Sequence, residues 1–298
     1  MMFRRALLLM SLVLAAVPAG AQAPAVAARP AAPRTILFIG NSFTYGAYSP
    51  VRGYRADTVS DLNNEAIGGV PALFKHFTEQ AGLDYAVSLE TAGGKGLEFH
   101  LAEKRAAIDK RFDVVILQGH SLLDRKNPGD PALHTAAAAG LAALFTARNP
   151  DVDLQLSATW SRADMVHQPG SRWSGTPIGQ MATDLRRASD QTRSAVPALD
   201  GIIPIGEAWN RAFATGIADP DPYDGTSFGK VDLWAYDHYH ASSHGYYLEA
   251  LLIFGRVTGR DPRSLGARER AAFDLGIAPA VVTALQAIAF ETLAAEPR

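Results

Sequence analysis

Cysteine is absent from the 298 residues of the sequence. This absence excludes a disulfide scaffold, zinc sites with cysteine ligands, iron–sulfur clusters and a cysteine nucleophile. A strong excess of one charge is also lacking, because 28 lysines and arginines stand against 30 aspartates and glutamates. Non-specific nucleic-acid binding needs a concentrated positive field, so we expect no nucleic-acid partner. The hydrophobic content of 48% predicts a globular protein that is stabilised by a packed core.

Long apolar runs are rare, and the main exception lies at the start of the chain. Two arginines precede an apolar stretch over residues 6–17, and small residues follow at 18–21. This layout predicts a cleaved secretory signal peptide over residues 1–21, since its apolar part is short for a membrane span. Residues 22–33, rich in alanine and proline, are predicted to form a flexible lead-in. We therefore expect an exported protein, periplasmic or secreted, with one domain over residues 34–298 and no membrane span after cleavage.

Strands and helices are predicted to alternate along the body of the chain. Short apolar runs predict buried parallel strands at residues 35–39, 85–89, 113–117, 152–158 and 201–205. Helical spacing of apolar residues predicts helices at 71–81, 97–110, 131–147, 178–196, 207–218 and 244–257, with more helix from 268 onward. This alternation favours an α/β fold, a three-layer α/β/α sandwich around a mainly parallel sheet of five strands.

Two long connections interrupt this alternation, at residues 160–176 and 219–233. Both contain glycine, proline and aspartate, tryptophans lie in the first and directly after the second, and both are longer than most connections in compact domains. Two interpretations stay open, a lid or binding wall on one hand and a mobile surface excursion on the other. Trp160 and Trp234 are candidates to stack on a sugar ring, although tryptophan also serves as a core anchor.

Candidate catalytic residues occur in two distant stretches. Ser42 stands in the run GNSFT directly after the first predicted strand, and the carboxyl ends of parallel strands are where open α/β sheets bind ligands. Asp237 lies three residues before His240, so its carboxylate can reach the imidazole within one tight turn. A carboxylate in that position fixes the histidine tautomer and stabilises the imidazolium formed when the ring takes a serine proton.

These two blocks, GNSFT and DHYHASSHGYYL, resemble those of the SGNH, or GDSL-type, serine hydrolase superfamily. The match extends in block order over essentially the whole chain after the predicted signal peptide. The resemblance implies an SGNH, flavodoxin-like fold in which Ser42 is the nucleophile, His240 the general base and Asp237 its orienting partner. It also implies an oxyanion hole that includes the backbone N–H of Ser42.

Two further blocks resemble the superfamily less closely. Thr91-Ala92-Gly93-Gly94 follows the second predicted strand, and it implies that Gly94, or otherwise Gly93, lines the oxyanion hole. After the third strand the family has an asparagine, whereas this chain has Leu117-Gln118-Gly119-His120. Gln118 carries the same amide N–H on a longer stem and is expected to be the side-chain donor of the oxyanion hole.

By resemblance, the chain is expected to be a serine ester hydrolase that needs no metal or cofactor and removes short acyl groups, such as acetyl, from carbohydrate. Lipase, arylesterase or acyltransferase activity at the same site is an alternative, and a catalytically silent carbohydrate-binding protein is another. Asn41 and His120, which stand beside the motif residues, are candidate substrate contacts; for His120 a packed or solvated role fits equally.

Two other patterns were weighed against this interpretation. Ser227 lies in a G-x-S-x-G run, the nucleophile elbow of α/β-hydrolases, but the run lacks the strand and helix that this motif requires, so Ser227 is interpreted as a loop residue. His238, His240 and His244 together with Asp237 are a conceivable metal cluster, but that interpretation leaves Ser42 without a role. We therefore predict no metal site.

Overall fold

The computed structural model describes residues 32–296 of the chain. The predicted signal peptide and residues 22–31 of the lead-in lie outside this range and stay predictions. The strands are β1 (Arg34–Gly40), β2 (Ser60–Asp61), β3 (Tyr85–Thr91), β4 (Val114–Leu117), β5 (Asp153–Ala158) and β6 (Gly201–Pro204). The helices are α1 (Gly69–Gln80), α2 (Leu97–Glu103), α3 (Arg105–Ile108), α4 (Ala132–Arg148), α5 (Ala163–His167), α6 (Gln180–Ala195), α7 (Ile205–Ala214), α8 (Ser243–Thr258), α9 (Arg270–Asp274) and α10 (Pro279–Ala294), with 3₁₀ turns at Pro50–Gly53, Ala56–Thr58 and Pro262–Leu265.

All strands of the sheet run parallel, in the order β2-β3-β1-β4-β5-β6. The predicted α/β fold with a central parallel sheet is confirmed, but the predicted number of five strands is wrong, because residues 32–296 form six. The additional strand, β2, has two residues and pairs with β3 at the edge of the sheet. A strand of this length is too short to show a hydrophobic pattern in the sequence.

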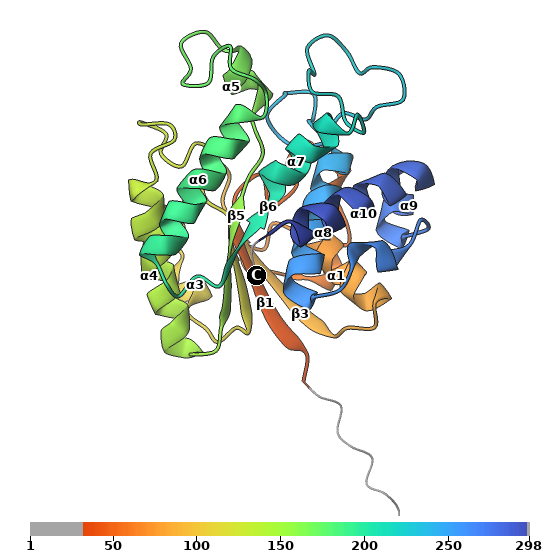
Figure 1. Cartoon of the computed structure of the whole chain (residues 1–298). Coiled ribbons are helices and arrows are strands. Elements are labelled where there is room, and N and C mark those ends of the chain that lie inside the picture. The colour runs from red at the N-terminus through yellow and green to blue at the C-terminus, as the bar shows by residue number, and fades with distance from the viewer. Residues whose placement is uncertain (1–31, 297–298) are drawn as a thin grey trace, which may run out of the picture. The chain divides into compact units, whose positions relative to one another are not determined.

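Helices cover both faces of the sheet, and the alternating side chains of β1 show the two layers. Ile36 and Phe38 pack in one hydrophobic cluster with residues of α1, α7, α8 and α10. Leu37 and Ile39 point to the opposite face and pack with residues of α2 and α4. Figure 1 shows α1, α8 and α10 on one side of the strands and α4 and α6 on the other. No helix in the described range is both long and apolar enough to cross a membrane.

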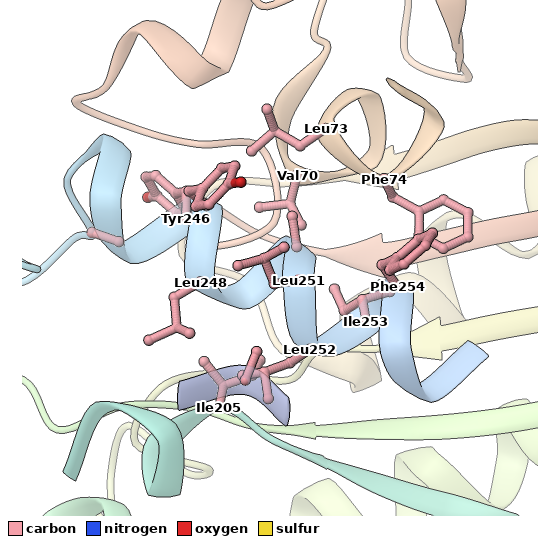
Figure 2. Packing of buried hydrophobic residues seen from close by; sticks show 14 of the residues in the cluster. Val70, Leu73, Phe74, Ile205, Tyr246, Leu248, Leu251, Leu252, Ile253 and Phe254 are labelled. Carbon is pink, nitrogen blue, oxygen red and sulfur yellow. The ribbon is translucent and has the colours of Figure 1, made fainter. Parts of the chain in front are cut away.

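Helix α8 is buried along most of its length and fixes the segment that precedes it. Its first turn is capped by the Ser242 side chain, which accepts hydrogen bonds from two backbone N–H groups, and it ends at Gly259 with φ of 67°. Figure 2 shows Leu252 of α8 beside Ile205 of α7, and Leu251 on the side of Val70 of α1. The polypeptide just before α8, which contains residues 237–240, is therefore held against the core.

The position of β1 in the sheet determines where a ligand can bind. β1 pairs with β3 on one side and with β4 on the other, so the chain crosses to opposite sides of β1 in successive connections. Open α/β sheets bind ligands in the crevice at such a switch point, beyond the carboxyl ends of the strands. The segments that leave β1, β3 and β4 there begin at residues 41, 92 and 118.

Candidate active site

Ser42 lies in the turn that follows β1, and Asn41 fixes this turn. The Asn41 amide donates to the carbonyl oxygens of Lys95 (2.8 Å) and Gly119 (3.0 Å), and its Oδ1 accepts from the Phe43 N–H (3.1 Å). Asn41 thereby joins the segments after β1, β3 and β4. It is buried and does not line the cavity described below, so the structure gives it a positioning role and does not place it at the predicted substrate contact.

The Ser42 hydroxyl faces open space. Among the described residues, Ser42 Oγ makes no hydrogen bond, and it is not one of their buried unpartnered atoms. Its carbonyl oxygen, by contrast, accepts a hydrogen bond of 3.2 Å from the hydroxyl of Tyr246, which is buried on α8. The nucleophile candidate is thus anchored through its backbone and free at its side chain.

His240 and Asp237 form a close pair in the turn before α8. Asp237 Oδ2 lies 2.6 Å from His240 Nδ1, and Oδ1 accepts from the backbone N–H groups of His240 (3.0 Å) and Tyr239 (3.2 Å). The carboxylate therefore fixes both the turn and the ring, which leaves Nε2 of the imidazole pointing away from the pair. His238, which lies in this turn between Asp237 and His240, has a φ of 56°. This backbone conformation is uncommon and is concentrated at functional sites.

The environment of the pair sets its charge. Burial lowers the pKa of His240, and the Asp237 carboxylate opposes this shift without reversing it. Burial also opposes ionisation of Asp237, but the hydrogen bonds that it accepts from His240 and Tyr239 lower its pKa overall. At neutral pH the pair is a neutral imidazole beside a carboxylate, which is the state that can accept a proton at Nε2.

Ser42 and His240 line one cavity of about 520 Å³, although they stand 198 positions apart in the chain (240 − 42). Glycines, tyrosines, a second histidine and two arginines complete its walls. Among residues 32–296, no hydrogen bond joins Ser42 Oγ to the His240 ring. Such bonds are often long in unliganded sites and tighten when substrate binds.

Backbone N–H groups suited to an oxyanion also reach this cavity. Gly93 and Gly94 line it, and the N–H groups of Ser42, Gly93 and Gly94 have no backbone or side-chain acceptor in the part of the chain that the structure describes. Gly94 has a φ of +66°, a conformation that glycine adopts readily and most other residues avoid. Which of the two glycines, Gly94 or Gly93, donates to the oxyanion stays open.

Gln118 does not line the cavity. Its Oε1 accepts from the Asn41 N–H (3.0 Å) and from the Thr44 hydroxyl (3.0 Å), and its Nε2 donates to the Gly119 carbonyl oxygen. Both ends of the amide are therefore engaged in holding the turn around Ser42. The expectation that Gln118 donates to an oxyanion disagrees with this geometry, because the amide is buried, does not line the cavity and donates to the Gly119 carbonyl oxygen.

The two tryptophans predicted as substrate contacts are also inside the protein. Trp160 has no exposed surface and stacks on Phe43 at 4.0 Å between ring centroids. Trp234 is 2% exposed, and its indole N–H donates to the Ser161 carbonyl oxygen at 2.9 Å. Neither indole lines the cavity, and the structure places both among buried residues rather than where a sugar could stack on them. Through Phe43, Trp160 instead supports the residue next to Ser42.

The alternative patterns lie apart from the cavity. Ser227 is exposed in a loop, with its backbone N–H donating to Asp219 Oδ2 at 2.7 Å, and it does not line the cavity. His238 and His244 do not converge with His240 on a common point: in the range 32–296 no three histidine, aspartate or glutamate side chains are grouped as metal ligands.

The cavity also contains residues that the sequence did not single out: Tyr45, Tyr48, Tyr239, Leu122 and Arg125. Arg162, from the connection over residues 160–176, lines it as well. Only proximity to the two motifs marks the tyrosines in the sequence, and nothing marks Arg125. A further cavity of about 530 Å³ lies between α1 and α9, but none of the predicted site residues and no serine, threonine or cysteine lines it. The predicted nucleophile and the predicted base both line the cavity beside Ser42, and neither lines this further cavity.

Comparison with known proteins bears on the fold. No protein-family model and no curated protein matches the sequence. Among solved structures, a DUF4886 family protein from Bacteroides uniformis is 20% identical, with a TM-score of 0.63 over 89% of this chain and 96% of that chain. A protein described as a GDSL-like lipase, from Parabacteroides merdae, is 16% identical, with a TM-score of 0.53 over 76% of this chain and 95% of that chain.

An acetylxylan esterase from Geobacillus stearothermophilus, solved as a catalytic mutant, is also 16% identical, with a TM-score of 0.50 over 77% of this chain and 95% of that chain. Likenesses at such identities concern the backbone and its topology. Together with the parallel sheet and the position of the cavity, they show that the chain has the fold of the SGNH, or GDSL-type, hydrolases.

Proposed function

We propose that the protein is an exported serine ester hydrolase that uses Ser42, His240 and Asp237 and removes short acyl groups from carbohydrate. The observation that carries this proposal is the shared cavity: an accessible, unbonded Ser42 hydroxyl and an imidazole that is held at Nδ1 by a carboxylate. Nucleophilic catalysis by serine requires such a base, oriented by a third group.

In the proposed reaction, Ser42 Oγ bonds to the ester carbonyl carbon while its proton passes to His240 Nε2. The electron pair of the carbonyl bond moves to oxygen, and the resulting oxyanion accepts hydrogen bonds from the N–H groups of Ser42 and Gly94. Asp237 stabilises the imidazolium. His240 then protonates the departing alcohol, and a water molecule repeats the sequence on the acyl-enzyme to release the carboxylic acid.

The cavity walls favour a polar, ring-shaped substrate. Tyr45, Tyr48 and Tyr239 line it, and the exposed Tyr48 forms an edge-to-face pair with Tyr236 at its rim, with ring centroids 5.4 Å apart. Aromatic rings beside an open polar cavity suit the faces of sugars. The esterase from Geobacillus stearothermophilus acts on acetylated xylan by its name, which also favours acetyl esters of carbohydrate here.

The charge of the cavity favours a substrate with an anionic group. No aspartate or glutamate lines it, and Arg162 is engaged by Asp164 through contacts of 2.6 and 3.0 Å. Arg125 has no hydrogen bond or ion pair in the described range. A free guanidinium recognises carboxylates in a bidentate manner, so acetylated acidic sugars belong among the proposed substrates.

The proposal is tested with purified protein on nitrophenyl acetate, butyrate and octanoate and on acetylated xylo-oligosaccharides. We expect hydrolysis that is faster for the short acyl chains, and a loss of at least ~10³-fold in kcat for Ser42→Ala. Ser227→Ala is the matched control and should keep the activity of the wild type, since Ser227 lies in an exposed loop.

Other outcomes separate the alternatives. Equal inactivity of wild type and Ser42→Ala, with binding of sugars retained, supports a silent carbohydrate-binding protein. Transfer of the acyl group to an added sugar, in preference to water, supports an acyltransferase. Faster hydrolysis of octanoate than of acetate supports a lipase. Activity that survives Ser42→Ala contradicts the proposed mechanism.

A further inference from the structure

The cavity beside Ser42 contains a second histidine, to which the proposed reaction assigns no role. His120 follows β4, and β4 pairs with β1 so that Leu117 lies opposite Ile39. The two strands therefore deliver His120 and Ser42 to the same end of the sheet. His120 is only 8% exposed, and it lines the cavity.

One hydrogen bond fixes the tautomer of the His120 ring. The backbone N–H of Leu122 donates to His120 Nδ1 at 3.1 Å. Because Nδ1 accepts a hydrogen bond, it carries no proton, and the ring hydrogen is on Nε2. In residues 32–296 this Nε2 has no partner, and unlike the Nε2 atoms of His100 and His134 it is not shut off from solvent. The ring therefore carries an N–H donor that is unpartnered within the described residues and open to solvent, on a residue that lines the cavity.

The surroundings keep this ring neutral. Burial lowers the pKa of His120 to about 4, and the positive charges of Arg125 and Arg162 act in the same direction. The two rings differ in the partner of Nδ1: in His240 it is the Asp237 carboxylate, and in His120 it is the backbone N–H of Leu122. Two histidines in one site with such different partners are suited to different tasks, one as a base and the other as a neutral hydrogen-bond donor.

We propose that His120 Nε2–H is the side-chain donor of the oxyanion hole, the position that the sequence alone assigned to Gln118. This inference rests on the proposed ester hydrolysis. When Ser42 Oγ adds to the carbonyl carbon, the oxyanion accepts hydrogen bonds from His120 Nε2 and from the backbone N–H groups of Ser42 and Gly94. No proton leaves His120 in this step; the proton of the serine hydroxyl goes to His240.

Gln118 supports this arrangement indirectly. Its amide holds Asn41 and Thr44, on either side of Ser42, and donates to Gly119, the residue before His120. A side chain at position 119 is also excluded, since a Cβ there would lie 2.4 Å from His134 Nδ1. The segment after β4 is thus packed so that residue 118 serves the fold and residue 120 reaches the cavity.

The test uses two substitutions, His120→Ala and His120→Gln, measured on nitrophenyl acetate and with a trifluoromethyl ketone, which forms a hemiketal with an oxyanion. Removal of one oxyanion donor typically lowers kcat by ~10²–10³-fold. We expect this loss in His120→Ala with KM within about threefold of wild type, and a similar loss of affinity for the ketone. Glutamine retains an N–H donor on a side chain of comparable reach, so His120→Gln should recover at least a tenth of the wild-type kcat.

The readouts also separate a merely structural role. Thermal unfolding reports on the fold, and the acid limb of the pH profile reports on His240 and should keep its midpoint in both variants. A kcat within threefold of wild type in His120→Ala, or equal losses in the alanine and glutamine variants, would overturn the inference while leaving the proposed function intact. Wild-type protein without esterase activity would remove both.

Discussion

Gln118→Ala distinguishes a structural glutamine from a catalytic one. The substitution removes the acceptor of the buried Asn41 N–H and of the Thr44 hydroxyl, each at 3.0 Å. Gly119 keeps one donor, because the Asn41 amide also reaches its carbonyl oxygen at 3.0 Å. Each of the two orphaned donors costs ~1–3 kcal/mol, and the one methylene that is lost, Cγ, contributes ~0.8 kcal/mol.

The sum for Gln118→Ala is roughly 4 kcal/mol, which is a large share of the ~5–15 kcal/mol that stabilise a typical fold. For a domain of this size we expect Tm to fall by about 10 °C. Because the amide does not reach the oxyanion, kcat of the folded protein should fall by less than ~10-fold. The assays are calorimetry and initial rates at a temperature where the variant is fully folded.

Gln155→Ala is the matched control for this prediction. Gln155 is as buried as Gln118 but lies on β5, where it is bonded to Asp153 and Arg256. It should lower Tm and leave kcat unchanged. If Gln118→Ala instead kept its Tm and lost kcat by 10²-fold or more, the reasoning would be refuted and Gln118 would be the oxyanion donor.

Three further predictions concern His240, Trp160 and Arg125. The rate of ester hydrolysis should rise with pH as His240 loses its proton, because a protonated ring cannot accept the serine proton. Since the pKa of His240 is lowered, the midpoint of this rise should lie below pH 6.5. A midpoint above pH 7 would contradict this expectation. Trp160→Ala should destabilise the fold by ~3–5 kcal/mol in urea unfolding, whereas an unchanged stability with a raised KM would mean that the indole contacts substrate. Arg125→Gln should raise KM by ~10-fold or more for an acetylated methyl glucuronide and leave KM for the matching glucoside unchanged; equal effects on both would refute charge recognition.

The sequence predicted those features that depend on short-range patterns. β4 is a continuous apolar run, and its partner β1 is another, so their burial between two helical layers follows from composition. The contact of Asp237 with His240 follows from their spacing of three residues in a turn. The two-residue strand β2 has no such pattern, and it depends on pairing with β3.

The errors concern side-chain direction. Gln118 and His120 follow the same strand, and both can donate an N–H, so their residue types do not show which one faces the cavity. The direction of each side chain depends on residues distant in the chain. Asn41 and Thr44 hydrogen-bond to Gln118 and hold it inside the fold, whereas His120 lines the cavity. Trp160 was misassigned for the same reason, since its loop folds inward onto Phe43.

Covalent labelling reports directly on which serine is the nucleophile. The full-length protein is treated with a fluorophosphonate, which reacts with an activated serine, and the modified peptide is identified by mass spectrometry. We expect one adduct, on Ser42, whose rate of formation falls strongly in His240→Ala. An adduct on Ser227, or hydrolysis of esters by a protein whose Ser42 stays unmodified, would contradict it.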